Sequence, residues 1–72
     1  MIRALNDYTF EAYTAGAVAM SAALYSSQGH LVASASQAGN TVTISAAGQN
    51  KGVYILRISD GKQTHAQKVV VR

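Results

Sequence analysis

Residues 52–72 read GVYILRISDGKQTHAQKVVVR, and this stretch decides the fold. Its first part, residues 52–59, carries β-branched and aromatic residues on both faces, which is typical of a central strand covered on both sides. The pair Asp60-Gly61 follows, and two-residue type I′ hairpin turns favour it because both central residues need a positive φ. Residues 63–72 then return as the partner strand, so the sequence predicts a terminal β-hairpin.

Further short strands are expected towards the N-terminus, separated by breaks that contain glycine. Apolar and polar residues alternate with a period of two, which indicates half-buried strands, at 4–13, 18–25 and 41–46. Residues 30–36 are expected to return as a strand after the turn at 26–29. In the segment 41–46, Val42, Ile44 and Ala46 are expected to point inward. In the first segment Tyr8 and Phe10 form the apolar face.

The segment 15–24 also allows a helix. It is rich in alanine, the best helix former, and a helix would place Met20 and Leu24 one turn apart. We expect a strand, because the segment runs directly into a turn and a β-like return, and a lone helix of this length is marginal.

Six or seven short strands without a convincing helix predict an all-β fold, either an antiparallel sandwich or a small barrel. The 72 residues make one domain, and a chain of this size buries only about 60% of the surface that it exposes when unfolded. No proline protects the strand edges, so an edge-strand or strand-swapped dimer is compatible with the sequence.

From the sequence we expect that the protein is not an enzyme and that it has no metal site and no cofactor. It contains no cysteine, which excludes a thiolate zinc site and a cysteine nucleophile. Asp7 and Glu11 would share one strand face about 13 Å apart, too far for a retaining carboxylate pair. His30 and His65 have no acidic neighbour in the sequence with which to bind a metal.

Charge is distributed unevenly along the chain, whose net charge is +3. The first 50 residues hold one cation, Arg3, against two carboxylates, whereas from Lys51 onward five cations face only Asp60. These cations are spread singly and not clustered, which favours a solvated strand face over a nucleic-acid-binding surface. No nucleic-acid partner is therefore expected.

Three blocks of the sequence resemble the type IX secretion C-terminal sorting domains, the Por secretion tail family. ALYSSQGHLV at 23–32 resembles the family's hairpin of apolar-Tyr-Asp-x-x-Gly-Arg-x-Val, with Ser26 and His30 standing where the family usually has an acid and an arginine. KGVYILRI at 51–58 is similar to its Gly-Val-Tyr strand. QKVVVR at 67–72 is similar to its terminal Lys-x-Val-Val strand.

The resemblance implies an immunoglobulin-like antiparallel β-sandwich of six or seven short strands. Residues 1–72 would be a single C-terminal sorting domain, with 18–72 as the family-like core and 1–17 as a weakly matched first strand and linker region. The residues expected to form the structural motif are Gly29, Gly52, Tyr54, Asp60 and Gly61.

The function that the resemblance implies is a secretion signal, covalently part of a larger cargo protein. It would direct the cargo through the periplasm and the outer membrane, so that the cargo is secreted or held at the cell surface. The implied partners are the outer-membrane type IX translocon and its shuttle and sortase components; the sortase would then cleave the domain, or the domain would be retained near it. The competing interpretation is a fibronectin-like or immunoglobulin-like interaction or adhesion module of a surface protein.

The tail is the expected partner-binding segment, with Lys68, Val69, Val70, Val71 and Arg72 as its residues. An edge strand offers unpaired N–H and C=O groups to which a partner strand can add. Lys68 and Arg72 would contact an acidic groove on the transport machinery, while the valines anchor the strand. The alternative is that the valines complete the core and the two cations solubilise its end.

Overall fold

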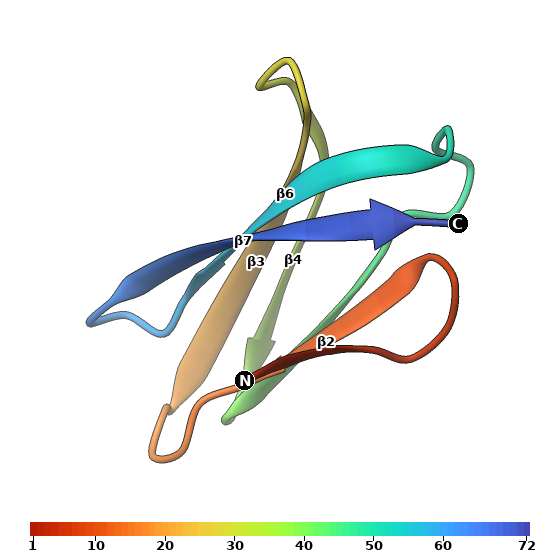
Figure 1. Ribbon diagram of the computed structural model, residues 1–72. Coiled ribbons are helices and arrows are strands. Elements are labelled where there is room, and N and C mark those ends of the chain that lie inside the picture. The colour runs from red at the N-terminus through yellow and green to blue at the C-terminus, as the bar shows by residue number, and fades with distance from the viewer.

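The computed structural model describes residues 1–72, and all of the regular structure is β-strand. The seven strands form two layers (Figure 1). Their bounds are β1 Ile2–Ala4, β2 Thr9–Tyr13, β3 Ala19–Ser26, β4 Leu31–Ala38, β5 Thr41–Ser45, β6 Gly52–Ser59 and β7 Thr64–Val71.

One sheet has the order β1-β2-β5 and the other β4-β3-β6-β7, and every pairing is antiparallel. Lettered as in immunoglobulin domains, β1, β2 and β5 are strands A, B and E, while β3, β6 and β7 are C, F and G. β4 takes the place of strand C′ beside C, not of strand D beside E. The predicted immunoglobulin-like antiparallel sandwich of six or seven strands is confirmed.

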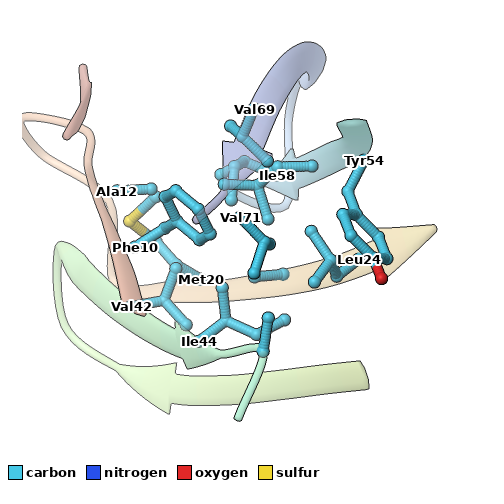
Figure 2. Packing of buried hydrophobic residues seen from close by; sticks show 13 residues of the cluster. Phe10, Ala12, Met20, Leu24, Val42, Ile44, Tyr54, Ile58, Val69 and Val71 are labelled. Atoms are coloured by element: carbon cyan, nitrogen blue, oxygen red, sulfur yellow. The ribbon is translucent and has the colours of Figure 1, made fainter. Parts of the chain in front are cut away.

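The core lies between the sheets and contains apolar side chains from both (Figure 2). Alternation along each strand produces it, since every second side chain points to the other layer. Val42, Ile44 and Ala46 are buried as the sequence predicts, and no buried side-chain nitrogen or oxygen lacks a hydrogen-bond partner. The core residues are Phe10, Ala12, Met20, Ala22, Leu24, Val42, Ile44, Ala46, Tyr54, Leu56, Ile58, Val69 and Val71.

The segment predicted as one strand over 4–13 is a hairpin of two strands, β1 and β2. A polar bend separates them, in which the Asn6 side-chain oxygen accepts the backbone N–H of Tyr8 at 3.0 Å. Tyr8 lies in this bend and is 43% exposed, so the prediction that it shares one strand face with Phe10 is wrong. Phe10 is buried as expected.

β3 confirms that the alanine-rich segment is a strand and not a helix. It pairs with β4 on one side and with β6 on the other, so that two ladders hold it extended. Met20 and Leu24 are both buried, but Val18 precedes the strand and is 85% exposed.

β6 is central within its sheet, as predicted, but only one of its faces is covered. Tyr54, Leu56 and Ile58 point into the core, whereas Val53 on the opposite face is 44% exposed. The prediction of a strand covered on both sides is therefore wrong. A two-layer sandwich covers each sheet on one face, and the remaining apolar residues of β6 form part of the surface.

The turn between β6 and β7 also differs from the predicted type I′ pair. Four residues, 60–63, separate the strands, and only Gly61 among them has a positive φ, of 90°. The carboxylate of Asp60 accepts the backbone N–H groups of Gln63 at 2.7 Å and Lys62 at 2.9 Å. This local side-chain bonding replaces the left-handed conformation that a type I′ turn would impose on Asp60.

Candidate functional site

β7 is an edge strand whose backbone is paired along one side only. Its ladder joins it to β6 from Gly52↔Val71 to Ser59↔Thr64, and no strand lies beyond it in the sheet. Figure 1 shows β7 at the margin of its sheet, with the C-terminus at the end of the molecule where β1 and β2 are connected.

The direction of each backbone group of β7 follows from the turn. The N–H of Asp60 donates to the carbonyl of Gln63 at 3.2 Å, and hydrogen-bonded pairs alternate with non-bonded pairs along an antiparallel ladder. The backbone groups that point away from β6 are therefore those of Thr64, Ala66, Lys68 and Val70. Arg72 continues this alternation, and its outward N–H donates to the carbonyl of Asp7 at 2.9 Å.

The four outward positions make no hydrogen bond through their backbone groups within the chain. An extended strand of another protein could bond to all of them, because the free side of an edge strand is a template for strand addition. Only the end of the edge, at Arg72, is closed by the bend that follows β1.

The side chains of the tail divide between the two faces of the strand. Val69 and Val71 are 7% and 3% exposed and point into the core, towards Ile58 and the residues of the other sheet (Figure 2). Val70 is 46% exposed on the opposite face, together with Lys68. Val69 and Val71 therefore complete the core, whereas Val70 lies on the surface.

The family-like motif in β6 lies directly opposite this tail. Gly52 pairs with Val71, Val53 with Val70 and Tyr54 with Val69. The hydroxyl of Tyr54 donates to the carbonyl of Asn50 at 2.6 Å, which fixes the ring beside Val69. Gly52 is the first residue of β6 and has a φ of 145°, a conformation that favours glycine. The pairs that this motif forms with β7 hold the terminal valines in register.

The remaining motif residues lie in turns, away from the outward groups of β7. Gly29 ends the turn after β3, where its N–H donates to the carbonyl of Ser26 at 2.9 Å. The hydroxyl of Ser26 accepts the N–H groups of Gln28 and His30, so this serine supplies the side-chain acceptor of the turn. Asp60 and Gly61 shape the β6–β7 turn.

A groove runs along the side of the sandwich where β7 faces β1. It consists of two hollows of about 640 and 330 Å³, and their lining includes Ile2 and Gln67 in both. The opposite side of the sandwich is closed, because β4 contacts β5 and the Gln37 side chain accepts the N–H of Thr43 at 2.8 Å. The free edge of β7 therefore lies at the open side.

Asp, Glu and His side chains form no group of three that could hold a metal ion. Arg3 and Glu11 form an ion pair at 2.9 Å on the exposed face of the three-stranded sheet. No helix of the chain is long and apolar enough to span a bilayer.

Sequence reasoning missed two parts of this arrangement. The carbonyl of Asp7, which closes the end of the edge, lies in a segment that had no matching motif. The outward backbone groups of Thr64 and Ala66 were also missed, because the predicted binding residues were limited to 68–72; counting alternate residues back from the turn would have found them.

The structure is that of a small β-sandwich with a free edge strand at β7. Residues 7–72 match the family described as the secretion system C-terminal sorting domain. No curated protein and no solved structure shows significant similarity to the chain.

The chain belongs to this family of secretion system C-terminal sorting domains. It is a non-catalytic secretion signal of the type IX system, and it serves cargo proteins that cross the outer membrane to the cell surface or the exterior. The family match favours this function over the fibronectin-like adhesion module, with which the domain shares only its sandwich architecture.

Proposed function

We propose that β7 is the element by which the export machinery recognises this sorting domain, through addition of a partner strand to its free edge. The observation that carries the proposal is the row of outward backbone groups at Thr64, Ala66, Lys68 and Val70, none of which is bonded within the chain. Val69 and Val71 hold the strand in the core, so the edge is presented without unfolding the domain.

Charge on the tail supports a partner with an acidic groove. Lys68 and Arg72 are exposed on either side of Val70, and the strand carries no carboxylate side chain. Opposite charges across an interface increase the rate of encounter and suppress wrong partners. The partners proposed are the translocon, shuttle and sortase components of the type IX system, with the sortase cleaving the domain or retaining it at the cell surface.

The test exploits proline, which lacks an N–H and is tolerated on edge strands where that group points to solvent. Ala66→Pro removes an outward N–H and leaves the ladder to β6 complete. Ser34→Pro is the matched control on β4, the other edge of the same sheet, where residue 34 also points its N–H outward. A reporter fused ahead of the domain is expressed in a bacterium with a type IX system, and surface and periplasmic reporter are measured.

We expect Ala66→Pro to retain the reporter in the periplasm and Ser34→Pro to export it normally. Thermal unfolding of each purified domain shows whether the fold persists. If Ala66→Pro does not fold, Thr64→Pro replaces it, because proline is accepted at the first residue of a strand. Normal export by a folded proline variant of β7 would exclude strand addition at this edge.

A further inference from the structure

The outer faces of the two sheets differ in chemistry. On the three-stranded sheet, the cross-strand pairs are Thr9↔Ser45, Glu11↔Thr43 and Tyr13↔Thr41, and Arg3 neutralises Glu11 at 2.9 Å. This face is polar and internally charge-balanced, as expected of a surface that only meets water.

The outer face of the four-stranded sheet carries an apolar patch at one end. Two rows cross the sheet, and the first joins Leu31, Tyr25 and Ile55 before it ends at Lys68; a register shift between Leu24 and Tyr25 brings Leu31 opposite Tyr25. The second row is Val53 opposite Val70. Side chains directly opposite one another on adjacent strands are in contact range, so the rows are continuous. We define the outer patch as Tyr25, Leu31, Val53, Ile55 and Val70.

The outer patch is accessible. Leu31 is 58% exposed, and Val53 and Val70 are each nearly half exposed, whereas Tyr25 and Ile55 are intermediate. Beyond it the same face becomes small and polar, ending in a row that consists of Ser36, Ser21, Ser59 and Thr64. The apolar residues are therefore confined to the end of the face that adjoins the terminal valines.

The charges at the border of the outer patch are all positive. Lys68 ends its first row, and Arg57 lies one row further along the sheet, opposite Ala23. The three carboxylate residues lie elsewhere, in the bend after β1, on β2 and in the β6–β7 turn. Neither cation is in a salt bridge within the chain.

We propose that the outer patch is a second docking surface, and that its occupant is a protein with an apolar centre and a carboxylate rim. The proposal rests on the proposed function, that the folded domain is recognised by partners, and adds a face to the edge already described. Interface cores are apolar and interface rims are polar, and a positive rim selects a negative one. Lys68 and Val70 belong to both surfaces, so one partner could add a strand to β7 and cover the patch.

A membrane surface suits the outer patch less well. The chain has no tryptophan and its one phenylalanine is in the core, so Tyr25 is the single aromatic residue that the patch offers to a bilayer interface. Two cations near an anionic leaflet contribute only about 1 kcal/mol each. For a protein partner, the extents of 33 × 23 × 16 Å limit one face to roughly the 800 Å² that each side of a standard interface buries. A patch on part of that face fits a transient complex.

The test separates the face from the edge. Val53→Thr combined with Ile55→Thr removes apolar contacts and keeps β-branched side chains, and Arg57→Glu reverses a border charge. Val18→Thr and Lys62→Glu are matched controls, at an exposed valine and an exposed lysine away from the patch. Each variant is measured in the same reporter fusion as Ala66→Pro, with thermal unfolding to confirm the fold.

We expect both patch variants to reduce surface delivery by about tenfold or more, the change that ~1.4 kcal/mol of lost binding free energy produces, while the controls deliver normally. If the patch variants fold and deliver the reporter normally, the proposal that the outer patch is a docking surface is overturned. The edge proposal stands in that case if Ala66→Pro is still defective. Normal delivery by all of them would overturn both. If the patch variants are defective and Ala66→Pro delivers normally, the outer-patch proposal is supported and the proposal of strand addition at the edge of β7 is overturned.

Two further measurements make the test complete. If the variant with both Val53→Thr and Ile55→Thr does not fold, Arg57→Glu alone decides the result. Arg57 is exposed, and Arg57→Lys, which keeps the positive charge, is its control. Purified domain is also sedimented with vesicles of phosphatidylglycerol and phosphatidylcholine. Vesicle binding by the wild type that Arg57→Glu abolishes would overturn the protein occupant in favour of a lipid surface.

Discussion

Asp60 stabilises the β6–β7 turn through its ionised carboxylate. Backbone N–H donation from Gln63, and then from Lys62, lowers the pKa of Asp60 below its usual value of 3.8. Because the pKa is lower in the folded than in the unfolded state, this contribution to stability is complete above the unfolded pKa and is lost as the pH falls through the folded pKa. We therefore expect Asp60→Ala to lower Tm at neutral pH, and its deficit to shrink below pH 3.8.

Asp60→Asn is the matched control, since its amide oxygen still accepts both N–H groups but does not ionise. At neutral pH, the Tm of Asp60→Asn should fall less below that of the wild type than the Tm of Asp60→Ala does. Circular dichroism melting over a pH series measures all three proteins. An Asp60→Ala deficit that is the same at neutral pH and well below pH 3.8 would show that the charge of the carboxylate does not contribute.

At the scale of the element, the two sides of β7 should respond differently to truncation. Val71 is 3% exposed, and Val71→Ala removes two buried methyl groups at about 0.8 kcal/mol each and leaves a small cavity, so we expect a loss of about 2 kcal/mol. Val70 is 46% exposed, and Val70→Ala should change stability by no more than about 0.5 kcal/mol. Urea denaturation measures both. Equal losses would mean that the tail does not separate into a core face and a partner face.

The same elements show how far sequence reasoning reaches. β5 could be predicted because its alternation is uninterrupted, and β7 because it follows the turn at Asp60-Gly61 and ends in three β-branched residues. β1 could not, since three residues of strand give too short a pattern, and the bend after it depends on an Asn6 side-chain bond. Val53 and Ile55 were read as core of a doubly covered strand, although their true environment depends on how many layers the fold has.

For the candidate site, the tail residues could be predicted but not their division between core and surface. Three consecutive valines contain no alternation, so the pattern does not indicate which of them point inward. That depends on register, which places Val69 opposite the buried Tyr54 and Val70 opposite the exposed Val53. The outer patch was missed for a related reason, since its rows join residues from four strands that only the sheet order brings together.

At the scale of the whole molecule, the family match begins at Asp7 and leaves out β1, which the structure nevertheless pairs with β2. Only Ile2 of β1 packs against the core, whereas the Asp7 carbonyl that closes the end of β7 lies inside the match. Deletion of residues 1–6 should therefore preserve both the outer patch and the edge of β7. We expect this variant to fold cooperatively with a free energy of unfolding lower by about 1–2 kcal/mol, from lost burial of Ile2 and lost ladder bonds.

Export of a reporter by the shortened domain should equal that of the full chain, because neither proposed docking surface includes β1. The control is Arg3→Ala with Glu11→Ala, which removes the exposed ion pair between β1 and β2 and keeps the strand. Melting curves of the purified proteins and surface reporter levels are compared side by side. A shortened domain that is folded at the growth temperature but fails to export would place part of the signal in the first strand, and the recognition surface would then have to extend across the groove from β7 to β1.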